Sequence, residues 1–424
     1  MRPPWTRAFG WRARAIALGL VLVGAACGRG GSPPTRAAEV PPSAAPTTAG
    51  VGAEGAGLRA VPGLPIDPGH TVGDPTILEN LAVFPVYARA QEDIGDFLTL
   101  DSALAKGSAV VRELGPEADA VPLPDRAANE EPAQQRSPQA QLQNAPIQRV
   151  ANRARGDGAQ VNTLVIENKG ELPILVLAGT VVKGGKQDRQ IGQDFVVGAR
   201  STTPVDAFCV EHGRWTQTRE GVATNGQFAT APTLANDEVR AAGQYERNQS
   251  QVWAKVGKVS AATKKASASG TLMATLDDAD LKAARARLAG GARAHLDGVE
   301  AAGDVVGVAY AVDGEVRAVR FFLNAKMFRQ YEQTLVETAA VDAVTAQATA
   351  KGAGKPVGSG EATAKAVVDF VTKVGSGRRE ERDTAAENVN AYQFSDDGWS
   401  SQATMKPKAG KPAKAVTKDF LRKK

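Results

Sequence analysis

The sequence predicts an α+β fold: an antiparallel β meander or sandwich core with packed helices, between a disordered N-terminal tether and a basic C-terminal tail. Two observations indicate the sheet. Residues 161–215 contain short apolar, β-branched runs separated by Gly and Pro, the spacing of antiparallel strands. Residues 304–322 read as two strands around an Asp-Gly turn. A third observation indicates the helices, because long segments with helical periodicity follow residue 240.

The first 26 residues read as an export signal. Several arginines precede the apolar run AIALGLVLVGAAC, which is too short to span a bilayer as a permanent helix. The small residues at 24–26 stand directly before Cys27, and this pattern resembles a bacterial lipobox, in which the thiol receives a lipid. We therefore predict a signal peptide at 1–26 and an exported, periplasmic lipoprotein anchored to the membrane through Cys27. Cleavage after Ala26, giving a soluble exported protein, is the alternative.

Positive charge is concentrated at the two ends of the chain. The sequence has 51 Lys and Arg against 46 Asp and Glu, a net charge of +5. Removal of residues 1–26 deletes four arginines and leaves 51 − 4 − 46 = +1. Residues 405–424 hold eight basic residues and one acid, an excess of +7, so residues 27–404 carry about −6. We therefore expect no nucleic-acid-binding core.

The chain has two cysteines, Cys27 and Cys209. If Cys27 carries a lipid, Cys209 has no partner within the chain, which excludes a disulfide scaffold. Cys209 is then either a buried structural thiol or a reactive one.

Four segments follow the signal peptide. Residues 27–72 have many Pro, Gly and Ala and no hydrophobic periodicity, which predicts a flexible tether. The main domain is expected at 73–345, with a Pro- and Gln-rich surface insertion at 115–157. A helix and hairpin extension is expected at 346–404, and a disordered basic tail at 405–424.

The main domain is expected to begin with a buried strand at 79–89, ENLAVFPVYAR. Asp101 or Ser102 can cap a short helix that Gly107 ends, and SAVVREL then reads as a second strand. VNTLVIEN and LPILVLAG, joined by KGE, predict a hairpin. Residues 216–240 are polar and predict a loop.

The later elements are predicted from periodicity and turn residues. Helices are expected at AGQYERNQSQVWAKVGKVSAATKKAS, DDADLKAARARLAGGARAHL, NAKMFRQYEQTLVETAAVDAVTAQ and EATAKAVVDFVTKV. A hairpin turns at Asp313-Gly314, and a final one at Asp396-Asp397-Gly398. GSGRREERD, between the last helix and the last hairpin, predicts a charged break.

The segment GGKQDRQIG contains three candidate ligand-binding residues, Lys186, Gln187 and Arg189. Gly184 and Gly185 permit a tight turn with free backbone amides, and the two cations add donors, so the loop can bind phosphate or carboxylate. It is not a P-loop, because the GxxxxGK[ST] spacing is absent. The competing interpretation is a hairpin turn with solvated charges.

The segment FCVEHGRWTQ brings together a thiol, a carboxylate, an imidazole, a guanidinium and an indole. Strand alternation places Cys209 and Glu211 on one face and His212 on the other, so a Cys–His pair requires the strand to end near Glu211. Arg214 can pair with Glu211, and Trp215 can pack or stack. Cys209 and Glu211 are the catalytic candidates, and a buried thiol beside an Arg–Glu clamp is the alternative.

Several segments, in order, resemble the ARG and rhodanese-phosphatase-superfamily-associated protein domain: ENLAVFPV, LVIENKGELPILVLAGTVVKGGKQDR, TTPVDAFCVEHGRW, SQVW and GVAYAVDGEVRAVRFFLNAKMFRQYEQTLV. The resemblance covers roughly residues 79–345. Its most specific residues are Gly184, Lys186, Gln187, Arg189, Cys209, Glu211, Gly213, Arg214 and Trp215. The chain departs from the family at Thr180, where the family tends to carry Glu, and at Asp188, where it tends to carry Asn. The resemblance implies a domain and no particular reaction.

Three functional hypotheses remain open. The first is a binding or interaction module with a site for an anionic or nucleotide-like small molecule, lined by Lys186, Gln187, Arg189, Arg214 and Trp215 beside Glu211. The second is a hydrolase or transferase that uses Cys209 or Glu211. The third is a purely structural envelope protein. Convergence of the two motifs in one pocket would favour the first two, and full burial or separation would favour the third.

No metal or other cofactor is expected. The strand rhythm around 161–215 is similar to that of a cupin, but a cupin metal site needs clustered histidines. The three histidines, His70, His212 and His295, are far apart in the sequence.

Overall fold

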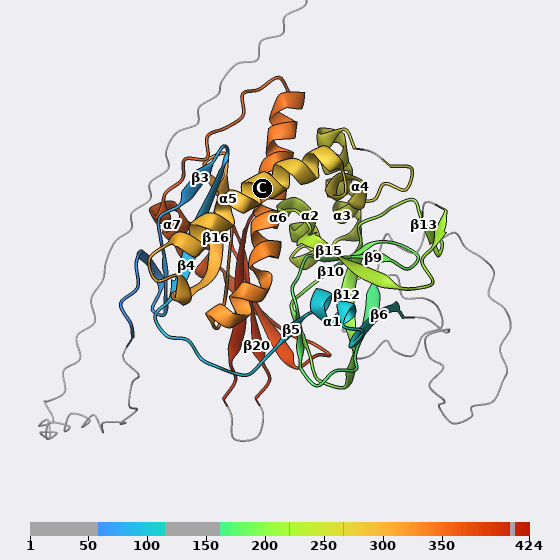
Figure 1. The fold of residues 1–424 in the computed structure, drawn as a ribbon, viewed down its shortest axis with the longest axis horizontal. Coiled ribbons are helices and arrows are strands. Elements are labelled where there is room, and N and C mark those ends of the chain that lie inside the picture. Colours follow the sequence, from blue (N-terminus) through green and yellow to red (C-terminus); the bar gives the residue numbers. More distant parts are fainter. Residues whose placement is uncertain (1–57, 115–161, 220, 266, 408–411) are drawn as a thin grey trace, which may run out of the picture. The chain divides into compact units, whose positions relative to one another are not determined.

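The computed structural model describes residues 58–114, 162–219, 221–265, 267–407 and 412–424 (Figure 1). It confirms the predicted α+β class, with seven α-helices and four β-sheets in this part of the chain. All strand pairings are antiparallel except that of β5 with β8. The predicted signal peptide, Cys27 and the 115–157 insertion lie outside the described residues.

The largest sheet has ten strands in the order β1-β2-β4-β16-β17-β21-β20-β19-β18, with β3 paired to β4. It joins the first described strands of the chain to the last ones. The predicted tether at 27–72 is therefore wrong at its end, because residues 64–67 and 70–72 form the first two strands of this sheet. Its strands are β1 (Leu64–Asp67), β2 (His70–Val72), β3 (Thr76–Leu78), β4 (Leu81–Ala88), β16 (Val305–Val312), β17 (Glu315–Phe322), β18 (Arg378–Asp383), β19 (Asn388–Phe394), β20 (Gly398–Met405) and β21 (Ala415–Arg422).

A second sheet of six strands has the order β15-β9-β10-β12-β7-β6. Its strands are β6 (Ala109–Glu113), β7 (Thr163–Asn168), β9 (Thr180–Gly184), β10 (Arg189–Ile191), β12 (Ser201–Cys209) and β15 (Phe228–Leu234). A small sheet contains β5 (Leu98–Thr99), β8 (Ile174–Val176) and β11 (Phe195–Val197), and a two-stranded ribbon contains β13 (Thr218–Arg219) and β14 (Val222–Ala223).

The helices cover both faces of the large sheet and connect it to the second one (Figure 1). They are α1 (Leu100–Ala105), α2 (Asp237–Gln244), α3 (Gln249–Thr263), α4 (Met273–Leu276), α5 (Ala279–Gly298), α6 (Ala325–Gly352) and α7 (Ala364–Gly375). Helix α6 packs against β16 of the large sheet and also against β15 of the second sheet.

Strand β4 explains how the large sheet is buried on both faces. Leu81 and Val83 join the core beneath α5 and α6, whereas Ala82 and Phe84 join the core beneath α7. Successive side chains of a strand point to opposite faces, so a strand covered by helices on both sides reads as a continuous apolar run. All eight residues of β4 are buried.

A buried ionic network connects the large sheet to helix α2 and to the loop between β10 and β11. Arg320 of β17 donates from Nε to Asp419 of β21 at 3.1 Å and from Nη1 to Asp194 at 3.2 Å. Asp419 also accepts from Arg240 of α2 at 3.2 Å and from the Tyr245 hydroxyl at 2.9 Å. All five side chains are buried, so the pairing of charges within the network compensates their removal from water.

Local sequence signals predicted many elements correctly. The Asp313-Gly314 turn connects β16 to β17 with positive φ at both positions, 53° and 79°, as a two-residue hairpin requires. Asp278 caps α5 through its carboxylate. The predicted Asp101 or Ser102 cap of α1 is wrong, because Thr99 is the N-cap and Ser102 completes a capping box with it.

Two other local predictions are wrong. The two strands expected to form a hairpin, β7 and β8, belong to different sheets, because β7 pairs with β6 and β12 while β8 pairs with β11 and β5. The predicted loop at 216–240 contains β13, β14, β15 and the start of α2. Strand β15 pairs with the remote strand β9, which the local residues do not reveal, whereas β13 and β14 pair with each other in a short ribbon.

The C-terminal region differs most from expectation. The charged break at GSGRREERD forms the edge strand β18, and residues 415–422 of the predicted disordered tail form β21, in the middle of the large sheet. Val416, Phe420 and Leu421 are buried there, so the apolar residues between the lysines decide the structure. The expected 346–404 extension contributes α7, β18, β19 and β20 to the same sheet as the main domain.

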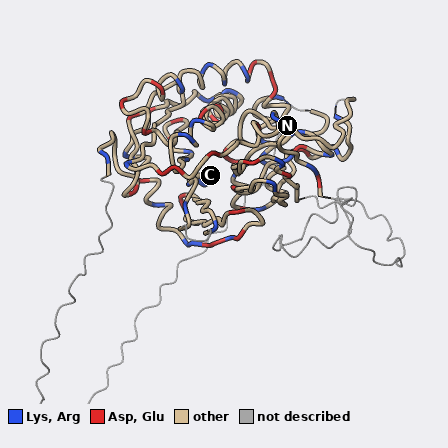
Figure 2. Tube along the Cα trace, turned by 60° about the horizontal axis from the view of Figure 1, so that its bottom comes forward, with Lys and Arg blue, Asp and Glu red and all other residues tan. Residues whose placement is uncertain are grey.

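Acidic and basic residues are interspersed along the described chain, as Figure 2 shows. No helix among the described residues is long and apolar enough to cross a membrane.

Candidate functional site

The GGKQDR loop connects β9 to β10 and is built on two glycines. Gly184 and Gly185 have φ values of 140° and 47°. A Cβ at Gly184 would lie 2.0 Å from the Gln227 carbonyl oxygen, and one at Gly185 would lie 2.2 Å from the Phe228 ring. Both positions therefore require glycine, for the backbone conformation and for the close approach of β15.

The loop amides are already engaged within the protein. Gly184 N–H donates to Asp188 Oδ1 at 3.0 Å, and Gly185 N–H donates to the Gln227 carbonyl at 3.0 Å. Lys186 N–H donates to Glu113 Oε1 at 2.8 Å. The predicted cradle of free backbone amides is therefore wrong for these three groups, because side chains and the neighbouring strand satisfy them.

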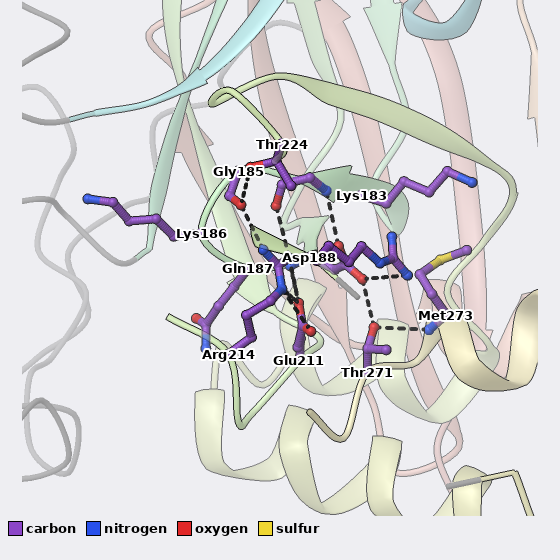
Figure 3. Close-up of polar contacts among 12 residues, drawn as sticks. Lys183, Gly185, Lys186, Gln187, Asp188, Glu211, Arg214, Thr224, Thr271 and Met273 are labelled. Carbon is purple, nitrogen blue, oxygen red and sulfur yellow. Dashed lines mark hydrogen bonds and ion pairs between the residues drawn. The ribbon is translucent and has the colours of Figure 1, made fainter. Parts of the chain in front are cut away.

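Arg214 joins the two motifs (Figure 3). We call the buried group formed by Arg214, Glu211, Asp188 and the Gly184-Gly185 turn the clamp. The Arg214 Nε lies 3.0 Å from both carboxylate oxygens of Glu211. Its Nη1 donates to the Gly185 carbonyl at 2.7 Å, and its Nη2 donates to the Gly184 carbonyl at 3.1 Å and to Asp188 Oδ1 at 3.3 Å. Its Nε is thus used by Glu211 and its two terminal nitrogens hold the loop, and the residue is only 8% exposed.

Asp188 is the second acid of the clamp and is fully buried. Its Oδ2 accepts from the Thr271 hydroxyl at 2.7 Å and lies 3.5 Å from Arg219 Nη2. Burial raises the pKa of Asp188, and the nearby charge of Glu211 raises it further. Thr271 and Arg219 were missed by sequence reasoning, because neither belongs to a recognisable motif.

Glu211 is held in its ionised form. Burial alone pushes its pKa upward, but hydrogen bonds from Arg214, from Ser269 and from the Asp188 N–H outweigh it and bring the pKa below the ordinary value. A general base works best with a pKa near the operating pH. The environment of Glu211 therefore favours a structural carboxylate over a catalytic one.

Cys209 is the last residue of β12, opposite Arg189 of β10. Its side chain is fully buried, and burial raises the pKa of the thiol although the Arg189 charge opposes the shift. A nucleophilic thiolate needs a lowered pKa and access to substrate. His212 is exposed beyond the strand end and contacts the Trp253 ring edge-on at 4.6 Å. These features favour a structural thiol.

The outer edge of the clamp carries the remaining candidates. Arg189 is buried, with Nη1 donating to Gln187 Oε1 at 3.2 Å and Nη2 lying 3.6 Å from Glu113. Its guanidinium lies 5.7 Å from the centre of the Trp215 ring, which is 38% exposed. Lys186 points away from the clamp in Figure 3 and lies 4.0 Å from Glu113.

The two sequence motifs therefore converge, which favours the binding and enzyme hypotheses, but most of their charge is buried, which favours the structural one. Four cations and three carboxylates contact one another, an excess of 4 − 3 = +1; they are Lys186, Arg189, Arg214, Arg219, Glu113, Asp188 and Glu211. Among the described residues there is no group of three or more His, Cys, Asp or Glu side chains that could hold a metal ion.

One comparison with known proteins gives a match. The model of the ARG and Rhodanese-Phosphatase-superfamily-associated Protein domain matches residues 69–414, which is most of the chain. The match continues past residue 345, the end of the domain expected from the sequence, and so includes α7 and the strands β18 to β20. No curated protein and no solved structure matches the chain.

Proposed function

The chain belongs to the ARG and Rhodanese-Phosphatase-superfamily-associated Protein family, and from this premise and the site geometry we propose that it is a binding module for a small anionic ligand. Lys186 and Trp215 are the accessible ligand contacts at the edge of the clamp, and Gln187 and Arg189, which are 5% and 2% exposed, meet the ligand from below the surface. Arg214, which the sequence placed among the ligand-binding residues, acts indirectly by fixing the loop, because its donors are engaged.

The single observation that carries the proposal is the state of Arg189. Its Nε is buried and has no hydrogen-bond partner among the described residues. Leaving a charged donor unsatisfied is costly, and a carboxylate or phosphate oxygen is its best acceptor. The half-exposed Trp215 ring beside it supplies a flat apolar surface on which an aromatic ligand such as a nucleobase can stack. Glu113 offsets part of the positive charge, so we expect modest affinity.

The proposal is tested by calorimetric titration with inorganic phosphate and with AMP. We expect AMP to bind more tightly than phosphate, because it adds stacking on Trp215. Lys186→Ala and Trp215→Ala should each weaken AMP binding about tenfold. Lys365→Ala is the matched control. Lys365 is an exposed lysine on α7 that pairs with Asp369 and is not part of the proposed site.

Equal affinity of the wild-type protein and the Lys186 and Trp215 variants would contradict the proposal, and so would no binding at ~10 mM ligand, a level far above a useful dissociation constant. The latter result would favour the purely structural alternative. The enzymatic alternative requires turnover that Cys209→Ser or Glu211→Gln abolishes without unfolding the protein.

We further propose that this module is exported and anchored to a bacterial membrane by a lipid on Cys27. The signal-like residues 1–26 and the Pro- and Gly-rich segment that follows them support this location. The test is mass spectrometry of the mature N-terminus. A diacylglyceryl mass on Cys27 is expected, and an unmodified Cys27 in the mature chain would exclude the anchor.

A further inference from the structure

A groove of about 330 Å³ lies between α6 and the second sheet, at the start of β9. The clamp loop follows the other end of this strand, so the groove is a separate site that the proposed anion site does not include. Its volume lies in the range of small-molecule pockets, ~300–1,000 Å³. It is lined by sixteen residues from β5, α1, β8, β9, β15 and α6 and the turn after β8.

The lining combines an apolar floor with neutral polar groups. Eight of its sixteen residues are Thr, Gln or Tyr, seven are apolar, and one, Asp101, is acidic. The described residues of the lining include no Lys, Arg or His. An anion would therefore lose its hydration in the groove without gaining a cationic partner, so the groove suits an uncharged ligand.

The hydroxyl groups of the sheet side offer acceptors to such a ligand. Thr180 Oγ1 donates its hydrogen to the Leu177 carbonyl at 2.7 Å, and Thr230 Oγ1 donates to Asp101 Oδ1 at 2.5 Å. Their remaining lone pairs can only accept, and the Asp101 carboxylate also only accepts. A complementary ligand must therefore donate several hydrogen bonds.

The helix side offers groups that can donate and accept. Gln330 and Gln333 are exposed, and Thr334 is half-buried, at i, i+3 and i+4 of α6. This spacing places them on one face of the helix. The Gln333 amide already donates to Glu337 Oε1 at 3.0 Å, which leaves its second N–H and its carbonyl for a ligand. Tyr331, on the same stretch, is fixed to the floor because its hydroxyl donates to the Leu175 carbonyl. The helix is thus held in register with the floor of the groove.

The hydrogen-bonded pairing of strand β15 is irregular at this groove. Its pairing with β9 is interrupted between Thr230 and Leu234, so residues 231–233 leave the regular register where they line the groove. Thr233 is 1% exposed, and its Oγ1 has no hydrogen-bond partner among the described residues. A β-bulge of this kind next to a cavity is a common way to shape a binding site.

From this lining we propose that the groove binds an uncharged polyol, such as one or more sugar units, with ring C–H groups on the apolar floor and hydroxyls between Thr180, Thr230 and the glutamines of α6. A polyol supplies the donors that the threonines and Asp101 lack, and it also accepts from the Gln amides. A single exposed carboxylate selects weakly for a cation, so an amine is the less favoured donor.

The test is titration of the full exported chain with glucose, maltose and N-acetylglucosamine, and with putrescine as the amine. Binding is followed by calorimetry and by amide NMR shifts. At least one sugar is expected to bind with shifts at α6 and β15. Gln330→Ala and Thr334→Ala should each weaken it about tenfold. Thr349→Ala is the matched control, since Thr349 is an exposed α6 threonine outside the groove.

The sugar proposal is overturned if no sugar binds at ~10 mM, far above a useful dissociation constant. It is also overturned if the Gln330 and Thr334 variants bind the sugar as well as the control does. Tighter binding of putrescine that Asp101→Asn removes would replace the polyol by an amine. Lys186→Ala, which impairs the anion site, should leave sugar binding unchanged, so failure of one site does not decide the other.

Discussion

Replacement of Arg214 by alanine tests the clamp directly. In the wild-type protein its guanidinium neutralises two carboxylates, Glu211 and Asp188, that are 1% and 0% exposed, and it satisfies the carbonyls of Gly184 and Gly185. Removal of one partner of a buried ion pair typically costs ~3–5 kcal/mol. Asp188 limits the loss, because its pKa is already raised and Arg219 still lies 3.5 Å away. We therefore expect a loss of about 3 kcal/mol in the free energy of unfolding.

The assay is urea denaturation followed by far-UV circular dichroism at neutral pH. Arg379→Ala is the control, because Arg379 and its partner Glu381 are more than half exposed and such pairs contribute little. Arg214→Lys should also destabilise, since one ammonium cannot replace three guanidinium nitrogens in a fixed geometry. If Arg214→Lys is as stable as wild type, or Arg214→Ala loses less than about 1 kcal/mol, the reasoning about a geometric clamp is refuted.

Three further predictions address other buried groups. Cys209 should resist iodoacetamide in the native protein and react after unfolding, because it is fully buried and its pKa is raised; rapid native labelling would contradict this. Burial and the charge of Asp237 raise the pKa of Asp342 to about 7, so the stability linked to its protonated form is present at low pH and is lost as the pH rises through 7. Asp342→Asn should therefore flatten the fall in urea midpoint between about pH 4, near the ordinary pKa of the unfolded carboxyl, and pH 7, and an unchanged pH profile would contradict the assignment. Deletion of residues 415–424 should leave an insoluble or unfolded chain, because it removes a strand paired on both sides; a soluble, folded product would show that β21 is dispensable.

Elements decided by local chemistry were predictable from the sequence. The Asp313-Gly314 turn fixes its hairpin because both positions have positive φ, and Asp278 marks the start of α5 by capping it. Strand pairing is different, since each partner is remote. Strands β7 and β8 are neighbours in sequence, and yet each pairs with strands elsewhere.

Strand β21 shows why composition misled at the C-terminus. The basic residues in and around it suggested a solvated tail, but Val416, Phe420 and Leu421 are buried, and Asp419 pairs with Arg240 and Arg320. The partners of Asp419 are about a hundred residues or more away in the chain. An acid with no local partner gives no sign in the sequence that it belongs to a buried network.

The candidate site was predictable in its members but not in their roles. Both motifs were identified, and Arg214 was expected to pair with Glu211. The sequence could not show that Asp188 and Glu113 occupy the loop amides, because those contacts depend on how β6, β10 and β12 pair. Without that information, an engaged amide and a free one look the same.

The distinction between clamp and edge residues gives the two motifs separable effects. A residue such as Arg214 acts on the free protein, so its replacement lowers the unfolding free energy whether or not ligand is present. Lys186 and Trp215 are partly exposed and make few contacts within the fold, so their replacement should leave the urea midpoint almost unchanged. If replacement of Lys186 or Trp215 weakens ligand binding without lowering the unfolding free energy, the binding proposal is supported. If only replacement of Arg214 has an effect, and that effect is a lower unfolding free energy, the clamp alone explains it. Ligand affinity and unfolding free energy can both be measured for each variant. The purely structural alternative and the binding proposal therefore predict different results for the same set of variants.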